Sequence, residues 1–156
     1  MAITQAMATS FKVELMDAYH NFGTGPVRAS EAADTFYMSL YTATATLDAT
    51  TTVYTSSNET TGTGYTAGGI AVTNGTSPTA TNSSATAGVA FWTPSASLTY
   101  TSVTLSTAFD TVLIYNSSKS NYAVSVHTFG AQTVTAGTFT LTMPTNDSTN
   151  ALIRIA

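Results

Sequence analysis

The chain of 156 residues contains no cysteine, which excludes disulfide bonds and thiolate metal sites. Charged residues make up only 8% of the chain, against about one quarter in an ordinary soluble domain, and threonine is abundant instead. A surface with few charges loses little favourable hydration when a partner covers it. The composition therefore indicates a protein that assembles with others.

Strong positive charge and long apolar runs are also missing. The net charge is −4, so no basic patch is available to neutralise phosphates, and we expect no nucleic-acid partner. No apolar run approaches the roughly 20 residues that span a bilayer. Met1–Gln5 lacks the cationic start of a signal peptide. We therefore expect neither export by that route nor a membrane partner.

The usual patterns of catalytic and metal sites are absent from the sequence. His20 and His127 are far apart and lack His or Cys neighbours at ligand spacing, so we interpret each as a structural histidine. The carboxylates occur singly, although those of separate strands could converge, and no serine occupies a Gly-x-Ser-x-Gly motif. We predict a protein that is not an enzyme, with no catalytic residues, no metal site and no cofactor.

Near the N-terminus, apolar residues recur at spacings of three and four, which is typical of an amphipathic helix. Thr4 is a suitable cap for its start, and Gly23, Gly25 and Pro26 end it. The apolar stripe could pack on the body of the same chain or against the same helix of a neighbouring subunit. With one residue of the following linker, it forms our candidate assembly interface: Met7, Phe11, Leu15, Tyr19, Phe22 and Arg28.

Beyond residue 34 the period changes from 3.6 to 2 residues, which is typical of β-strands. The alternation is clearest in Thr138–Met143, and two apolar runs around a polar turn predict a central hairpin over Thr111–Gly130. About eight or nine short strands predict a mainly β fold, an antiparallel β-sandwich of jelly-roll type, preceded by one N-terminal α-helix. The predicted division is residues 1–34, helix and linker, and residues 35–156, the β-sandwich domain.

The glycine-rich segment Asn58–Gly69 carries a candidate loop site. It lacks the Gly-Lys-Ser/Thr of a phosphate-binding loop, so we interpret it as a long turn whose glycines supply positive φ angles. Glu59 is its only carboxylate, and Tyr65 is expected to anchor it by packing. Glu59 either caps or pairs within the turn or belongs to a binding site.

Three blocks of the sequence together resemble a known family: MAITQAMATSFKVELMDAYHNF, then DTFYMSLYTATATLDATTTVYT with NETTGTGYTAGG, and VLIYNSSKSNYAV with the terminal ALIRIA. They are similar to small virion structural proteins of tailed bacteriophages, including cyanophage-like viruses, described as structural, head-decoration or tail-associated. The resemblance covers most of the chain except residues 74–88, and the family has no catalytic motif to transfer. It implies a particle component that binds copies of itself and a larger protein lattice.

This resemblance leads us to expect a capsid decoration or cement protein that binds the major capsid protein as a homo-oligomer, with a trimer favoured, and stabilises the head. Its expected location is the virion, at the capsid surface, after synthesis in the host bacterial cytoplasm. One alternative is a tail-associated, fibre or spike protein that contacts host glycans through aromatic faces. The other is a carbohydrate-binding or carbohydrate-active β-sandwich. In the tail, fibre or spike alternative, the aromatic faces that would contact glycans are those of Tyr41, Tyr54, Tyr65, Trp92 and Tyr100.

Overall fold

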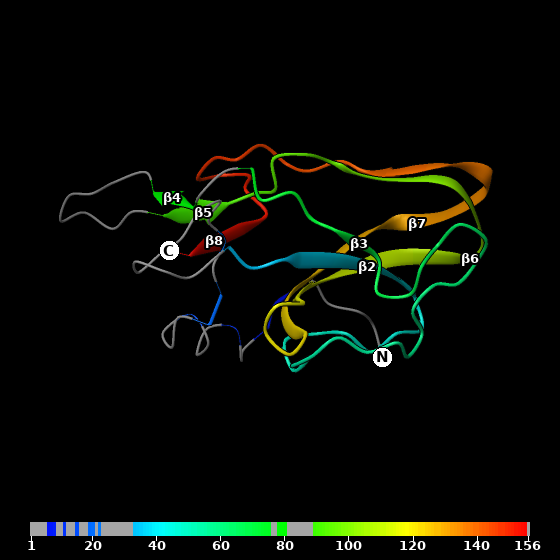
Figure 1. The fold of residues 1–156 in the computed structure, drawn as a ribbon, viewed down its shortest axis with the longest axis horizontal. Helices are drawn as coiled ribbons and strands as arrows, with labels where there is room; N and C mark the ends of the chain where they lie inside the picture. Colours follow the sequence, from blue (N-terminus) through cyan, green and yellow to red (C-terminus); the bar gives the residue numbers. More distant parts are fainter. Residues whose placement is uncertain are drawn as a thin grey trace.

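The computed structural model describes residues 6–8, 11, 15, 19–20, 22, 33–75, 78–80 and 89–155. Over these residues the chain is mainly β, with antiparallel strands in two sheets (Figure 1). The larger sheet has the order β1-β7-β6-β2-β3 and the smaller one β4-β5-β8. Their bounds are β1 Ala6–Met7, β2 Phe36–Thr42, β3 Ile70–Ala71, β4 Thr79–Ala80, β5 Ala90–Trp92, β6 Leu98–Asn116, β7 Tyr122–Leu141 and β8 Ile153–Ile155.

The mainly β character and the antiparallel pairing confirm the sequence prediction. In the described part of the chain, only β2, β6 and β7 are longer than three residues. The described residues thus hold fewer full strands than the eight or nine predicted. The reason is that two predicted pairs of strands merge into the single long strands β6 and β7, and most of the threonine-rich segment 43–69 forms a loop.

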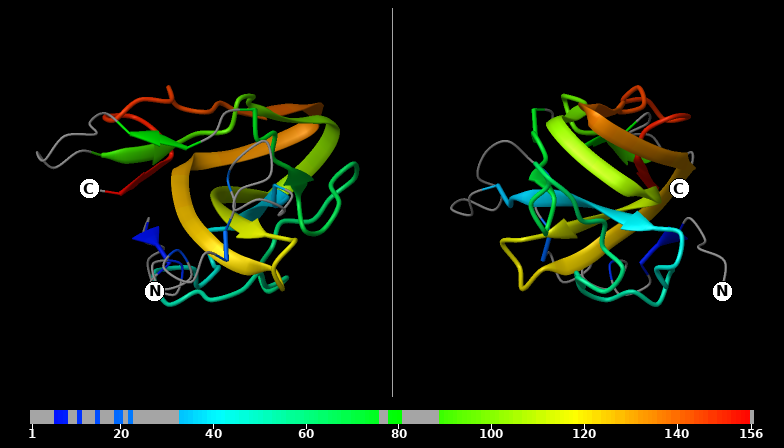
Figure 2. Two further views of the ribbon diagram at one scale, coloured as in Figure 1. Left: turned by 60° about the vertical axis from the view of Figure 1, so that its left-hand side comes forward. Right: turned by 90° about the vertical axis from the view of Figure 1, so that its right-hand side faces the viewer.

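The hairpin of β6 and β7 dominates the molecule, and it confirms and extends the hairpin predicted at residues 111–130. Its register runs from Leu98 opposite Leu141 to Asn116 opposite Tyr122. Several register shifts along the middle of both strands act as bulges and bend them. We call the part of the hairpin next to its turn the inner half, and the part that holds the start of β6 and the end of β7 the outer half. The outer half consequently folds back over the inner half, as Figures 1 and 2 show.

The core lies between the two halves of this bent hairpin and β2. β2 pairs with the inner half of β6, with Met38 opposite Ile114. The fully buried side chains include large residues of β2 and β6. They are Phe36, Met38, Leu40, Val103, Leu105, Phe109, Leu113 and Ile114.

The described residues Ala8, Phe11 and Phe22 of the N-terminal segment belong to this same core, and the segment differs from the predicted helix. β1 pairs with β7 at Val126 and Ser125, and residues 19, 20 and 22 are not helical. A helix from Thr4 to Phe22 is therefore wrong at both ends. Between these ends, residues 11 and 15 are helical, and the rest of the predicted helix lies outside the described residues. No helix in the described part of the chain is long and apolar enough to cross a membrane.

Aromatic packing explains why this segment joins the core. The ring of Phe22 stacks on that of Phe36 with centroids 4.4 Å apart, and it lies 4.7 Å from Trp92. Phe11 meets Phe22 edge to face at 5.8 Å. Such pairs contribute about 0.5 to 1.5 kcal/mol each beyond the burial of area. Residues on both sides of the predicted boundary at position 34 thus share one hydrophobic core.

Candidate functional site

Glu59 is a buried carboxylate, 7% exposed, surrounded by tyrosine side chains. Its Oε1 accepts hydrogen bonds from the Tyr65 hydroxyl at 2.6 Å and from the Gly68 backbone N–H at 2.7 Å. Its Oε2 accepts one from the Tyr54 hydroxyl at 2.6 Å. The two residues of the candidate loop site are therefore in direct contact, and Glu59 caps the backbone of its own turn.

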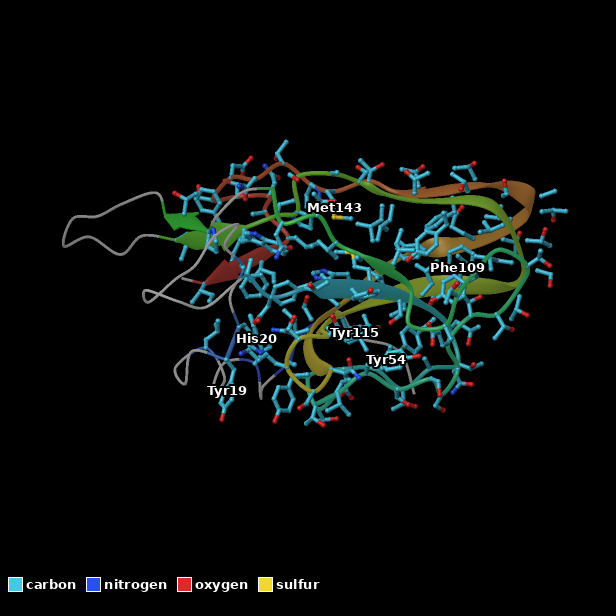
Figure 3. The ribbon with its side chains drawn as sticks, in the orientation of Figure 1. Tyr19, His20, Tyr54, Phe109, Tyr115 and Met143 are labelled. Carbon is cyan, nitrogen blue, oxygen red and sulfur yellow. The ribbon has the colours of Figure 1, made fainter. Side chains whose placement is uncertain are left out.

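Further tyrosine hydroxyls connect this loop to the sheet. Tyr100 donates to the carbonyl oxygen of Met38 at 2.7 Å, and Tyr115 donates to that of Gly68 at 2.8 Å. The Tyr65 hydroxyl also accepts the Leu40 N–H at 2.9 Å. Figure 3 shows Tyr54 and Tyr115 together below β2, where their rings stack 4.8 Å apart. Because the Glu59 carboxylate and these tyrosine hydroxyls are all hydrogen-bonded, the network holds the loop on the sheet.

The electrostatics of this cluster keep its tyrosines neutral. Burial raises the pKa of Tyr41 and of Tyr115 to about 12. Burial, followed by the nearby Glu59 carboxylate, also raises the pKa values of Tyr54, Tyr65 and Tyr100. Neutral hydroxyls at ordinary pH act as hydrogen-bond donors to the carboxylate. The cluster is therefore a structural clamp on the loop.

The burial of these rings bears on the aromatic faces considered for glycan binding. Tyr41, Trp92 and Tyr100 are at most 4% exposed. Tyr54 and Tyr65 are partly buried, with their hydroxyls held by Glu59. The first three rings thus fill the core and present no face to a ligand.

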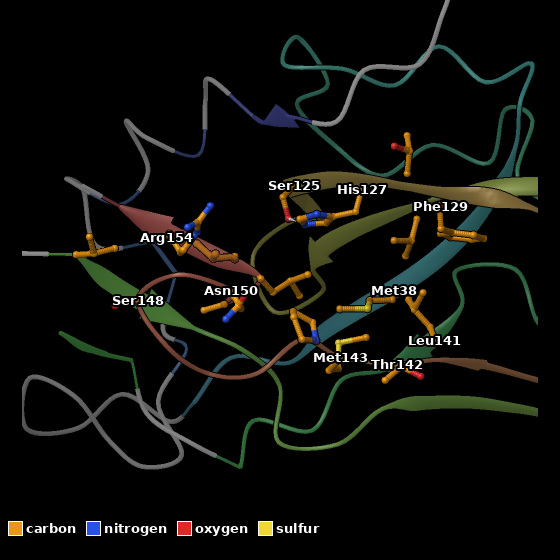
Figure 4. Close-up of a pocket in the computed structure, with 17 residues that line it drawn as sticks. Met38, Ser125, His127, Phe129, Leu141, Thr142, Met143, Ser148, Asn150 and Arg154 are labelled. Carbon is orange, nitrogen blue, oxygen red and sulfur yellow. Dashed lines mark hydrogen bonds between the residues drawn. The ribbon is translucent and has the colours of Figure 1, made fainter. Parts of the chain in front are cut away.

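A cavity of about 740 Å³ lies between the two halves of the bent hairpin and the C-terminal segment (Figure 4). Its walls are largely apolar, with Phe129, Leu141 and Met143 among them. The sequence reasoning missed this cavity because its walls come from distant segments.

One polar feature of the cavity is a pair on one face of β7, the Ser125 hydroxyl and His127 Nε2, 2.9 Å apart. Burial lowers the pKa of His127 to about 4, so its ring is neutral at pH 7. The pair therefore places hydrogen-bonding groups in a partly apolar wall of the cavity. The one available sequence signal was the two-residue spacing, which places both side chains on one face of the strand.

A small exposed apolar patch lies at another part of the surface. Tyr19 is 46% exposed and Val53 42%, although large apolar side chains are mostly buried in the described residues. The Tyr19 ring meets that of Tyr122 edge to face at 6.1 Å, and the backbone of Val53 bridges to Tyr122. We call these three residues the Tyr19 patch. In Figure 3, Tyr19 lies at the periphery of the molecule.

The residues of the predicted assembly interface differ in how far they are exposed. Tyr19 is exposed and Leu15 is partly buried. Phe11, 0% exposed, and Phe22, 7% exposed, lie in the subunit core, so they are corrected from interface to core residues. The side chain of Met7 and all of Arg28 lie outside the described residues.

The two histidines occupy different surroundings. His20 is buried, with its Nδ1 3.0 Å from the Asn116 side-chain nitrogen, and His127 lines the cavity. Within the described residues, no group of three or more His, Cys, Asp or Glu side chains could hold a metal ion. No family model, curated protein or solved structure matches this chain.

Proposed function

We propose that this chain is a non-enzymatic virion structural protein, a capsid decoration or cement protein that binds the major capsid protein lattice and stabilises the head. The observation that carries the proposal is the Tyr19 patch, in which two large apolar side chains are more than 40% exposed beside Tyr122. Exposed apolar residues gathered at one place are typical of a protein-binding surface.

The energetics favour a surface that acts in many copies. Full burial of a large apolar side chain contributes about 1.5 to 3 kcal/mol, so covering the remaining exposed parts of Tyr19 and Val53 contributes about 1 kcal/mol each. A contact of this size is weak alone, but it stabilises an assembled shell by mass action when repeated over the lattice. The low charge of the chain reduces the cost of covering the surface around it.

The proposal includes a homotrimer on the capsid surface and a two-layered sandwich, with the bent hairpin supplying both layers. Closed symmetry gives each copy the same contacts, which suits a component repeated over a shell. We propose the jelly roll as the fold class of this sandwich. A tail-associated location is the second reading of the same patch. The number of copies per purified particle distinguishes the two, because a head surface repeats a component many more times than a tail does.

Binding of variants to particles stripped of this protein tests the proposal. We expect Tyr19→Glu and Val53→Glu to lower the affinity for the particles by about tenfold or more, since each introduces a buried charge. Ile155→Glu is the matched control, because Ile155 is also an exposed apolar residue, at 44%, but lies outside the patch.

Three results would each contradict the proposal. The first is equal binding of all the variants, and the second is no binding of the parent protein to any particle. The third, which contradicts the cement role in particular, is that stripped particles resist heat as well as complete ones.

A further inference from the structure

β7 has an unpaired outer edge along most of its length. On one side it pairs with β6 from end to end of the hairpin. On the other side β1 covers only Val126 and Ser125. No strand among the residues that the structure describes pairs with this edge from His127 to Leu141. Figure 2 shows β7 as the rim of the outer half of the hairpin.

This edge lacks the charged residues and proline that usually protect a sheet edge against strand pairing. Natural sheets block their edges with charged side chains, proline or bulges. The sequence from Thr128 to Thr142 contains no Asp, Glu, Lys, Arg or Pro. The register shift nearest this end falls between Phe139 and Gly137, and beyond it Thr140 and Leu141 pair regularly with Thr99 and Leu98. The outer end of β7 is therefore a regular and uncharged edge.

The side chains along this edge suit an added strand. Thr138 and Thr140 are exposed, and Phe139 and Leu141 between them are half-buried. A groove of about 690 Å³ runs along the same stretch. A strand with the same alternation places its threonines beside these threonines and its apolar side chains beside Phe139 and Leu141. Such cross-strand pairs are the main stabilising contacts of a sheet.

We propose that residues 138–142 form a two-fold interface, in which the same edge of a second copy pairs antiparallel with this one and continues the sheet through both. The absence of charge and the regular alternation of threonine with apolar residues favour a second copy as the occupant. In a two-fold contact any charge near the axis faces its own copy, and this edge carries none. The pairing of β1 at Val126 shows that the β7 edge accepts an antiparallel strand. The contact is separate from the Tyr19 patch and from the three-fold contact of the proposed trimer, and it does not rest on the proposed virion role.

The absence of cysteine from the chain makes disulfide trapping a direct test. Thr138→Cys, Thr140→Cys and Thr142→Cys variants of the full chain are oxidised at low concentration, and dimers are counted on a non-reducing gel. Thr99→Cys is the matched control, because Thr99 is exposed and lies directly opposite Thr140 on β6. In the proposed pair the two copies of Thr99 are three strand spacings apart, about 14 Å, which is too far for a disulfide.

We expect a roughly tenfold excess of dimer for at least one of the three edge variants over Thr99→Cys, because only facing residues approach within disulfide distance. In sedimentation equilibrium, Thr140→Lys is expected to raise the dimer dissociation constant about tenfold or more, and Thr99→Lys about twofold or less. Circular dichroism establishes that each variant is folded, and if Thr140→Lys is not, the disulfide series decides.

The proposal is overturned if no edge variant forms more dimer than the control. It is equally overturned if both lysine variants dissociate alike, or if the parent chain is a monomer at every concentration. All these measurements use purified protein. Failure of particle binding in the Tyr19 patch experiment therefore leaves them unaffected, and the two proposals fail separately.

Discussion

The Tyr65 hydroxyl donates a hydrogen bond to Glu59 Oε1 across 2.6 Å, joining the one carboxylate of the glycine-rich loop to its aromatic anchor. Glu59 also accepts the Gly68 N–H, so the side chain closes the loop on itself. This bond helps to hold the loop of residues 58–69, which has few apolar side chains, against the sheet. Several consequences of the fold can be measured on the purified chain.

The stabilising effects of Glu59 and Tyr65 are expected to depend on each other, because the two side chains share a hydrogen bond. Glu59→Gln removes a charged acceptor from three donors and is expected to lower the free energy of unfolding by about 1.5 to 3 kcal/mol. Tyr65→Phe removes one of these donors. A double-mutant cycle by urea unfolding should give a coupling energy of about 1 kcal/mol or more. Additive effects of the two substitutions would contradict a direct contact.

His127 should make the protein less stable in mild acid. Burial lowers its pKa in the folded state to about 4, below the ordinary value of 6.5, so the folded chain favours the neutral ring. The resulting stability is complete above pH 6.5 and is lost as the pH falls from 6.5 towards 4, by at most about 3 kcal/mol.

Urea unfolding of the parent chain and of His127→Gln across this pH range measures the effect. The substituted chain should lose less stability on acidification than the parent does. An NMR titration of the His127 ring with a midpoint near its ordinary pKa would contradict the expectation.

Gly69 should tolerate no side chain. Its φ is 76°, and an added Cβ would lie 1.8 Å from the carbonyl oxygen of Met38 in β2. Gly69→Ala is therefore expected to lower the free energy of unfolding by more than about 2 kcal/mol, through backbone strain and displacement of the loop. Gly130→Ala is the control, since no atom lies within 4 Å of the Cβ added there. Similar thermal unfolding of both variants would refute the close approach.

The N-terminal segment should be needed for stability of the subunit. Phe22→Ala empties a site between Phe36 and Trp92, and we expect a loss of about 3 to 5 kcal/mol in the free energy of unfolding. Tyr19→Ala, at an exposed position of the same segment, should change it by about 0.5 kcal/mol or less. An equal and small effect of both substitutions would place Phe22 outside the core.

The sequence by itself determined the features that depend on neighbours along the chain. The alternation of Phe139 and Leu141 with threonines predicts a strand, and the polar run 116–121 predicts the turn of the hairpin, and both are confirmed. The glycines and single carboxylate of residues 58–69 predict a long turn with Glu59 and Tyr65 as its candidate site, and the two side chains are in contact. These patterns succeed because turn geometry and the two-residue period of a strand are local.

Only the tertiary structure decided where the N-terminal residues belong and where the hairpin bends. The spacing of Phe11, Leu15 and Phe22 fits a surface helix, but β1 pairs with β7, more than a hundred residues away in the sequence, and Phe22 stacks on Phe36. Burial in an existing core outweighs a local preference of a few tenths of a kcal/mol per residue. The bend likewise depends on bulges between distant strands, which creates both the cavity at His127 and the open edge of β7.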